Sequence, residues 1–201
     1  MKNKKITRKL SHGMYVLTTK DGGCMVDAVM QASAGENPII AVSVMKSNNT
    51  NILMKKNDKF ALSVLSNDVD GSIIETFGFN SMRDINKFDK VKCSNVDGLN
   101  IIDNSIGYLI CEKIDSIEND THTVFLGRMI EGDMFNNDKE MTYNYYQEHK
   151  DDLVKVKTDS NKTAWVCTLC GYIYYGDTLP DGFTCPRCGA GSEFFEKVSD
   201  K

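Results

Sequence analysis

The chain contains 201 residues, 41% of them hydrophobic, which suits one ordinary domain with a small appendage. Its formal net charge of −4 and its pI near 5.4 exclude the basic field that binding to nucleic acid or to an anionic membrane would require. The basic N-terminus, residues 1–10, runs into Ser11, His12 and Gly13 without an uninterrupted apolar stretch, so we expect neither a signal peptide nor a membrane span there.

Short strands dominate the first half of the chain. Runs rich in apolar and β-branched residues predict strands at 14–19, 24–33, 38–45 and 59–66. The first two flank a turn at 20–23, whose two glycines allow positive φ angles. The run at 38–45 is almost entirely apolar, so we expect this strand to be buried on both faces.

The apolar spacing also predicts short helices, at 4–12, 50–57, 71–77 and 142–149. Ile6 and Leu10 lie four residues apart and share one face of the first helix. Asn48, Asn49 or Thr50 can supply the side-chain cap of the second. The last helix is rich in tyrosine.

Residues after the third predicted helix form a long hairpin in our prediction. Residues 104–120 and 121–135 each alternate apolar and polar residues, with the turn at 118–121. The charged segment after the last helix has no periodicity and indicates a linker. Roughly six strands with few helices predict a mainly β fold. We divide it into a barrel at 1–150, a linker at 151–163 and a small unit at 164–201.

The small C-terminal unit contains two Cys-x-x-Cys pairs, Cys167/Cys170 and Cys185/Cys188. Each pair can place two thiolates on one side of a tight turn, and two such turns form a tetrahedral four-sulfur site that suits zinc or iron. Gly171 and Gly189 follow the second Cys of each pair and can adopt the positive φ angle that turns backbone amides toward the sulfurs. The unit is too small to fold on apolar burial alone, so bound metal must stabilise it.

The other three of the seven cysteines, Cys24, Cys93 and Cys111, lack disulfide-like spacing. Such usage is typical of the reducing cytosol, where thiols stay unpaired. The sequence therefore predicts a cytoplasmic protein.

The residues around the four C-terminal cysteines resemble rubredoxin, in particular its short form. The resemblance is carried by Trp165, Cys-Gly-Tyr at 170–172, Tyr174, Cys-Pro-Arg-Cys-Gly at 185–189, Phe194 and Phe195. It implies a single iron that is held by all four cysteines and passes one electron at a time. A structural zinc ribbon uses the same turns, and coordination chemistry alone does not separate the two metals.

Residues 5–149 are similar to the flavin reductase family with its FMN-binding split barrel. The matching segments, in chain order, are KLSHGMYVLTTKDG, AVMQAS, AVSVMKSNNT, FGFNSMRDINKF, THTVFLG and MTYNYY. The resemblance implies an NAD(P)H-dependent oxidoreductase that forms a homodimer with FMN at the subunit interface. No Rossmann fingerprint is present in the sequence to separate NADH from NADPH, and FAD in place of FMN stays open.

Joined to a rubredoxin-like unit, this domain resembles the high-molecular-weight rubredoxins of anaerobic bacteria. The resemblance implies that electrons pass from NAD(P)H through FMN to the iron, and then to a partner such as a flavodiiron protein that reduces oxygen or nitric oxide. Nicotinamide gives up two electrons as hydride and a thiolate-bound iron accepts one, so flavin is the converter between them. The tether between the two domains raises the effective concentration of iron near the flavin.

The resemblance also implies a set of flavin contacts. It places Lys46, Ser47, Asn48, Thr50, Ser81, Arg83 and Lys87 near the FMN phosphate, and Asp27, Ala28, Val29, Met30 and Gln31 along the isoalloxazine edge. Ser43, Phe77 and Gly78 are further predicted cofactor contacts. Amides at the start of the helix after Asn48 favour a phosphate. Without the resemblance, Arg83, Asp84 and Lys87 are typical of a solvated charge run. Asp27 and Ala28 depart from a common Asn-Thr pair of the family.

His122, in the segment THTVFLG, matches a family histidine near the flavin and the nicotinamide. We predict a role in positioning or charge balance, because hydride transfer itself needs no base. The alternative is an ordinary hydrogen-bonded histidine. Tyr143, Tyr145 and Tyr146 can stack near the cofactor or pack in an aromatic core.

Two other functions fit the same residues. One is a generic flavin or ferric reductase whose C-terminal unit is a structural zinc ribbon; metal content separates it, since zinc cannot take an electron. The other is a non-catalytic FMN-binding sensor or docking protein, which would bind FMN without oxidising NADH.

Overall fold

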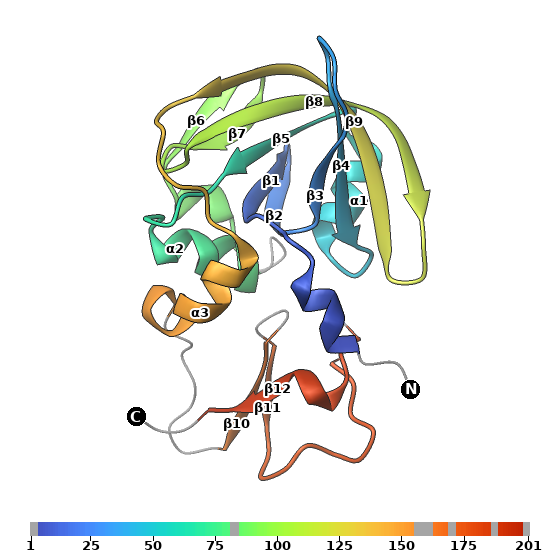
Figure 1. Ribbon diagram of the computed structural model, residues 1–201, viewed down its shortest axis with the longest axis vertical. Helices are drawn as coiled ribbons and strands as arrows, with labels where there is room; N and C mark the ends of the chain where they lie inside the picture. The colour runs from blue at the N-terminus through green and yellow to red at the C-terminus, as the bar shows by residue number, and fades with distance from the viewer. Residues whose placement is uncertain (1–3, 81–84, 155–162, 169–171, 186–188, 199–201) are drawn as a thin grey trace.

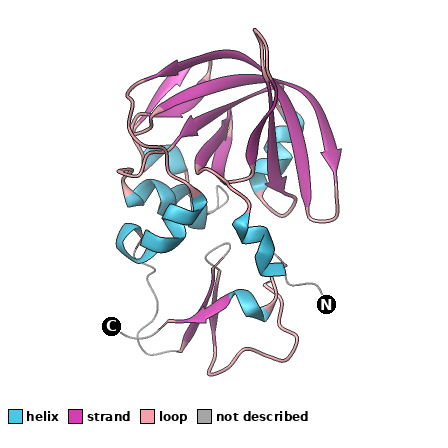
Figure 2. Ribbon diagram, in the orientation of Figure 1, coloured by secondary structure: helices cyan, strands magenta, loops and turns pink. Residues whose placement is uncertain are grey.

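The computed structural model describes residues 4–80, 85–154, 163–168, 172–185 and 189–198. These residues form a mainly β protein in two parts (Figures 1 and 2). The larger part is a curled seven-stranded sheet with helices at its sides and at one end. The smaller part is a three-stranded unit built from the C-terminal residues. The mainly β fold predicted from the sequence is confirmed.

The large sheet is antiparallel between every pair of neighbouring strands. Its strands are β1 (Tyr15–Thr19), β2 (Gly22–Val26), β3 (Val29–Ser33), β4 (Ile39–Met45), β5 (Lys59–Val64), β8 (Gly107–Glu118) and β9 (His122–Met134). Across the sheet they follow the order β2-β1-β5-β8-β9-β4-β3. The two edge strands, β2 and β3, are joined only by Asp27 and Ala28, so the sheet has to curl until its edges approach each other. The long hairpin predicted from the sequence is β8–β9.

The prediction of one strand over 24–33 is wrong. The structure has two strands there, β2 and β3, which pair with β1 and β4 at opposite edges of the sheet. The run of apolar residues resumes directly after Asp27, so composition alone does not reveal the turn between the strands. The strand predicted at 38–45 is β4, in which Ile40, Val42 and Val44 are buried, whereas Ser43 is half-buried.

A hairpin that the sequence analysis does not predict lies between β6 (Cys93–Val96) and β7 (Leu99–Ile102). Its turn is Asp97-Gly98, and both residues have positive φ angles, 50° and 79°. Asp-Gly between two short strands is a strong hairpin signal because a type I′ turn needs such angles. The information for this hairpin was therefore present in the sequence.

The helices lie close to their predicted positions. α1 (Asn49–Lys56) follows Asn48, whose side-chain oxygen accepts a hydrogen bond from the Thr50 amide at 3.0 Å, so the predicted cap is confirmed. α2 (Gly71–Ile74) continues into a π-helical turn, Glu75–Phe79. α3 (Tyr143–Leu153) extends beyond its predicted end at residue 149. The structure also has 3-10 turns at Lys4–Lys9, Lys87–Asp89 and Ser192–Phe194.

The barrel interior is filled by side chains from strands on all its sides, among them Leu17, Val42, Phe60, Leu62 and Phe125. Gly127 on β9 faces the ring of Phe60, and a Cβ at this position would lie 2.5 Å from two ring carbons. Glycine thus leaves the room that the Phe60 ring fills.

The C-terminal unit is a sheet of β10 (Ala164–Cys167), β11 (Ile173–Tyr175) and β12 (Phe195–Lys197), with β10 in the centre. Figure 1 shows it at the end of the barrel where α3 lies. Among the helices that the structure describes, none combines the length and the apolar character needed to cross a membrane.

Candidate functional site

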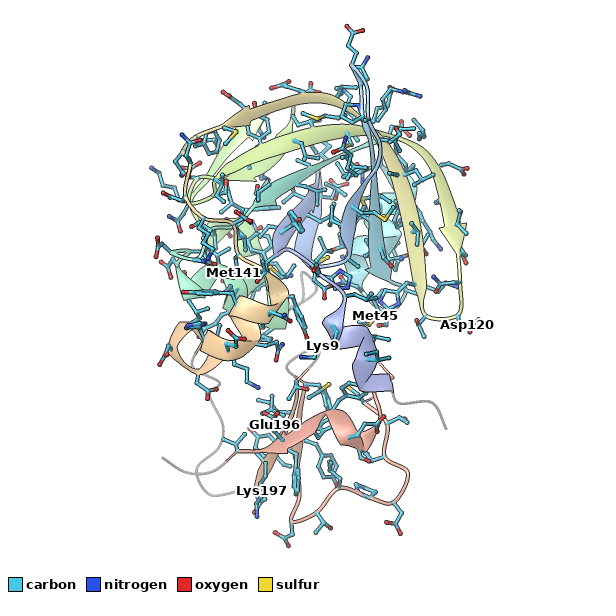
Figure 3. The ribbon with its side chains drawn as sticks, viewed as in Figure 1. Lys9, Met45, Asp120, Met141, Glu196 and Lys197 are labelled. Carbon is cyan, nitrogen blue, oxygen red and sulfur yellow. The ribbon has the colours of Figure 1, made fainter. Side chains whose placement is uncertain are left out.

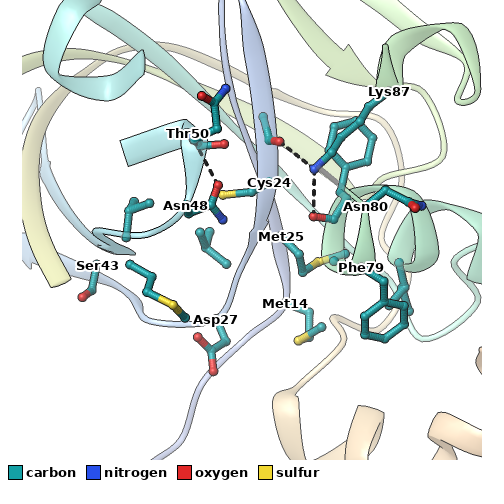
Figure 4. A pocket seen from close by; sticks show the side chains of 18 of the residues that line it. Met14, Cys24, Met25, Asp27, Ser43, Asn48, Thr50, Phe79, Asn80 and Lys87 are labelled. Carbon is teal, nitrogen blue, oxygen red and sulfur yellow. Dashed lines mark hydrogen bonds between the residues drawn. The ribbon is translucent and has the colours of Figure 1, made fainter. Parts of the chain in front are cut away.

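A pocket of about 250 Å³ opens in the barrel domain beside β2. Figure 4 shows Asn48 and Thr50, at the start of α1, on one side of β2, and Phe79, Asn80 and Lys87 on the other. The volume is near the lower end of pockets that hold small organic ligands, about 300–1,000 Å³. The pocket lies at the edge of the sheet because β2 is an edge strand and leaves space between α1 and the π-helical turn.

Nine of the residues predicted to contact cofactor or substrate line this pocket: Asp27, Ser43, Ser47, Asn48, Thr50, Phe77, Gly78, Lys87 and His122. They come from five separate segments of the chain. The structure does not bring Ala28, Val29, Met30 or Gln31 into the pocket, and Met30 on β3 is 62% exposed. The predicted contacts Ser81 and Arg83 lie outside the described residues.

Lys46 is also absent from the pocket lining. Its ammonium lies 3.3 Å from the carboxylate of Glu118, at the far end of the β8–β9 hairpin. Glu118 also pairs with Lys55 on α1. Exposed pairs of this kind contribute little to stability, so Lys46 is able to exchange this partner for another anion.

The start of α1 is the part of the pocket best suited to a phosphate. Thr50 is 1% exposed, and its hydroxyl Oγ1 has no hydrogen-bond partner among the described residues. A buried hydroxyl without a partner destabilises the folded protein, so its presence beside a helix N-terminus indicates an oxygen ligand. The residues present therefore fit the phosphate of a flavin nucleotide.

Thr50→Val is expected to weaken flavin binding about tenfold or more, because a hydrogen bond to a charged oxygen contributes about 1.5–3 kcal/mol. The same change should leave the ligand-free protein as stable as before, or more stable by up to ~1 kcal/mol, since it removes a buried hydroxyl that has no partner in the described part of the chain. Fluorescence titration with FMN and urea unfolding measure the two effects.

The matched control is Thr18→Val. Thr18 is equally buried, but its hydroxyl donates a hydrogen bond to the Asn100 carbonyl at 2.8 Å. Its loss should cost about 1 kcal/mol of stability and leave flavin affinity unchanged. Wild-type flavin affinity in Thr50→Val would exclude the hydroxyl as a ligand.

Lys87 lies in the opposite wall of the pocket. It is 2% exposed, and its ammonium donates hydrogen bonds to the carbonyls of Gly23 at 3.0 Å and Phe77 at 3.3 Å. The ammonium also lies 5.4 Å from the centre of the Phe77 ring. The interpretation of Lys87 as part of a solvated charge run is therefore wrong. A buried positive charge in the wall attracts an anionic ligand because little water screens it.

His122 begins β9 at the rim of the pocket and is half-buried. Its Nδ1 lies 2.8 Å from the Thr121 hydroxyl. Burial lowers the pKa of His122, and the carboxylate of Asp27 partly opposes this shift. The imidazole is therefore neutral at pH 7, which suits a residue that orients a ligand without changing its charge.

The lowered pKa of His122 gives a signed pH effect on stability. Below its ordinary pKa of 6.5, the unfolded chain binds a proton at His122 more readily than the folded chain does. Stability should consequently fall as pH drops from about 6.5 through the lower folded pKa, and His122→Asn should lessen this fall. Urea unfolding at pH 7.5 and 5.5 measures it; an NMR titration placing the His122 pKa above 6.5 would contradict it.

Cys167 on β10 and Cys185 lie in one buried cluster of the C-terminal unit, at 1% and 2% exposure. The cluster is largely aromatic and includes Trp165, Tyr172, Tyr174, Phe183, Phe194 and Phe195. The Gly189 amide donates to the Cys185 carbonyl at 2.8 Å with a φ of 72°, so the positive φ predicted at this glycine is confirmed. Two soft sulfur donors in apolar surroundings fit iron or zinc. The other predicted ligands, Cys170 and Cys188, and also Gly171, lie outside the described residues.

Several pocket residues were missed by the sequence analysis: Met45, Asn49, Phe79 and Asn80. Each lies inside or next to a segment that carries the family resemblance, so the segment was the available signal. Tyr143 and Tyr146 reach the pocket from α3, more than a hundred residues from β2 along the chain. Local pattern could not decide between this position and an aromatic core.

Comparison with known proteins extends this picture. Residues 7–153 match the flavin reductase like domain, and residues 165–196 match the rubrerythrin, rubredoxin-like domain. The high molecular weight rubredoxin of Moorella thermoacetica is 30% identical, over 96% of this chain and 99% of the relative. The ferric-chelate reductase (NAD(P)H) of Archaeoglobus fulgidus is 26% identical, over 78% of this chain and 94% of the relative.

Solved structures share the fold of the larger part. The NADH:FAD oxidoreductase of Streptomyces globisporus, in complex with NAD and FAD fragments, superposes with a TM-score of 0.62. It is 22% identical and the match covers 69% of this chain and 84% of that one. At this identity the likeness concerns the fold alone.

Proposed function

Since this chain belongs to the flavin reductase-like family and carries a rubredoxin-like domain, we propose that it moves electrons from NAD(P)H through FMN to an iron centre and on to a protein acceptor. The two domains together define an electron-transfer oxidoreductase. The observation that carries the finer proposal is the pocket whose buried Thr50 hydroxyl and Lys87 ammonium suit an anionic cofactor. We propose residues 1–150 as the flavin domain, 151–163 as a linker whose first three residues continue α3, and 164–201 as the metal domain.

A bound flavin accepts two electrons as hydride and returns them singly, and an iron held by four thiolates accepts one at a time. Each NAD(P)H oxidised therefore reduces two one-electron acceptors and releases NAD(P)⁺ and one proton. The residues of the chain bind the flavin and orient the nicotinamide. Thr50, at the start of the helix that Asn48 caps, holds the phosphate, Lys87 balances negative charge in the opposite wall, and neutral His122 positions the nicotinamide at the rim.

In the metal domain, Cys167, Cys170, Cys185 and Cys188 are the proposed ligands. Iron is proposed rather than zinc, because zinc has no redox chemistry and would leave the flavin without an acceptor in its own chain. The aromatic cluster around Cys167 and Cys185 supports this choice, since it keeps water from the sulfurs.

We propose a homodimer that completes the flavin site. On β9 the half-buried Val124 faces outward, and its neighbours across the sheet are Ser43 on β4 and Ile117 on β8, which is 60% exposed. Ser43 and His122 share this face of the sheet and line the pocket. A second copy of the chain packed on this face would cover the exposed apolar side chains and would also close the rim of the pocket.

For the acceptor we propose a separate flavodiiron-type reductase of oxygen or nitric oxide in the cytoplasm, supported by the likeness to a high molecular weight rubredoxin. A second candidate is a reductase of ferric chelates, because the Archaeoglobus relative carries that name. The two candidates differ in whether they need the C-terminal metal. A ferric chelate would take electrons from the barrel domain directly, whereas the protein acceptor would take them from the iron centre.

The deciding experiment is an anaerobic absorption spectrum of the purified protein with metal and flavin analysis. We expect flavin bands and ferric-thiolate absorption, with both bleached by NADH or NADPH. Flavin bleaching with an unchanged iron spectrum would contradict the relay. Zinc in place of iron would support the ferric-chelate alternative, and bound FMN without NAD(P)H oxidation would support a sensor or docking protein.

A further inference from the structure

Helix α3 contacts both the pocket and the metal domain. Tyr143 and Tyr146 line the pocket. Gln147 donates a hydrogen bond from its side-chain amide to the Thr168 carbonyl at 3.3 Å, and Lys150 lies 3.0 Å from the carboxylate of Glu196. These four helix positions are spaced i, i+3, i+4 and i+7, so they form one stripe along the helix.

The contacts on the metal domain lie close to a predicted metal ligand. Thr168 directly follows Cys167, and both its amide and its hydroxyl donate to the Phe194 carbonyl, at 2.7 and 2.9 Å. The Gln147 contact therefore reaches a residue that is fixed within the metal domain. Figure 3 shows Glu196 on the side of this domain that faces the barrel and Lys197 on the side that faces away.

We propose that the metal domain docks on the barrel of its own chain through this stripe, with Gln147 and Lys150 as positioning residues for electron transfer from flavin to iron. The proposal rests on the proposed function. Lys150 lies seven positions after Tyr143 in the helix, a rise of about 10 Å, so the pocket wall and the docking contacts are close together. Val154 and Thr163 are nine residues apart, a reach of at most ~30 Å, which suits docking on the same chain's helix.

Each docking contact is weak by itself, which suits a metal domain that must dock on the barrel and also leave it. The side chains of Lys150 and Glu196 are 28% and 65% exposed, and such pairs typically contribute less than about 1 kcal/mol. The tether supplies a high local concentration, so weak contacts suffice to populate the docked state. They also let the domain leave the barrel and present its metal to a one-electron protein acceptor.

Zero-length cross-linking tests the docking directly. A water-soluble carbodiimide joins the Lys150 amine to the Glu196 carboxylate as an amide with loss of water, provided that the two groups touch. Holoprotein labelled with ¹⁵N is mixed with unlabelled holoprotein. If native mass spectrometry shows dimers, the mixture is left until labelled and unlabelled subunits have exchanged; if it shows monomers, no exchange is needed. After digestion we expect Lys150–Glu196 cross-links that are wholly light or wholly heavy.

Cross-linked peptides of mixed isotope composition would mean docking on a partner chain and would overturn the proposal, as would absence of this cross-link. Lys59 and Asp97, an ion pair at 2.6 Å between barrel strand and barrel turn, provide the internal positive control. This readout does not depend on activity. The cross-link is expected even if the iron is never reduced by NAD(P)H. Absence of iron reduction would contradict the proposed function and not the docking.

Charge reversal tests the positioning role. Lys150→Glu should slow ferric-thiolate bleaching after anaerobic mixing with NAD(P)H by roughly threefold to tenfold, without slowing flavin reduction. The double variant Lys150→Glu with Glu196→Lys should recover the rate and a cross-link between the exchanged groups. Gln147→Ala should slow the same step, whereas Lys59→Glu, in a similarly exposed pair on the barrel, should not. Unchanged bleaching in both Lys150→Glu and Gln147→Ala would overturn the positioning role.

Discussion

Cys167→Ser is expected to abolish ferric-thiolate absorption and to reduce electron delivery to a protein acceptor by at least about hundredfold, while NAD(P)H-dependent reduction of free flavin continues. A serine hydroxyl is a hard, protonated ligand at neutral pH and does not replace a thiolate on iron. Even residues that only orient metal ligands typically change affinity by about 10–100-fold, so loss of a ligand should exceed that range. Because the metal stabilises a unit this small, the C-terminal domain should also lose its structure.

The measurement combines iron content, the visible spectrum and two anaerobic assays, one with free FMN and one with a protein acceptor. Cys93→Ser is the matched control. Cys93 lies in the barrel domain on β6, outside the C-terminal unit, and burial, with a smaller effect of Asp103, raises its pKa to about 11, so it stays a thiol at neutral pH. It should match wild type in both assays. If Cys167→Ser also matched wild type in both, the relay through the metal would be wrong.

Phe60→Ala is expected to destabilise the barrel by about 3–5 kcal/mol, the cost of emptying a fully buried aromatic position. That is a large share of the ~5–15 kcal/mol that stabilises a typical domain, so the urea midpoint should fall markedly with little change in slope. Phe135→Ala is the control, since that ring is 46% exposed and its loss should cost far less. Equal costs at the two positions would contradict the assigned core.

Gly127 makes this prediction sharper. In the wild-type barrel, Gly127→Ala should destabilise by about 1–3 kcal/mol, because the new methyl group would meet the Phe60 ring and the Cβ of Cys111. In the Phe60→Ala background the methyl group enters the vacated space, so its cost should shrink or change sign. A double-mutant cycle measures this coupling, expected at about 0.5–3 kcal/mol. Simple additivity would show that the two residues do not share one space.

The elements that sequence predicted well are those specified by neighbouring residues. The cap of α1 depends on Asn48 and an amide two residues away, and the positive φ of Gly189 depends on the turn after its own Cys pair. The hairpin β6–β7 belongs to the same class, because the neighbouring residues Asp97 and Gly98 specify its turn. The sequence analysis did not predict this hairpin, although the signal was local. The strand predicted over 24–33 failed for a different reason: β2 and β3 are distinguished by their partners at opposite edges of the sheet, and not by composition.

The candidate site shows the same division. The nine pocket residues predicted through the family segments do lie together, yet Lys46 in the same segment turns to Glu118 instead. In the local sequence, Lys87 is one of several charged residues and nothing distinguishes it from the others. Only the fold buries its ammonium against the carbonyls of Gly23 and Phe77. The role of α3 could not be read from its tyrosines, because its partners lie far along the chain on both sides.

By itself, the sequence determined the mainly β character of this protein and its four-cysteine C-terminal unit, because each depends on residue types at short, regular spacing. The flavin reductase family was recognised through a resemblance, which six separate segments carry by their order along the chain. Tertiary structure alone decided which hydroxyl is buried with no partner among the residues that the structure describes, which lysine enters the pocket wall and which helix lies between pocket and metal domain. Burial and partnership are properties of atoms brought together from distant segments. Local pattern does not encode them, since the same residue at the same spacing can face solvent or core depending on what packs against it.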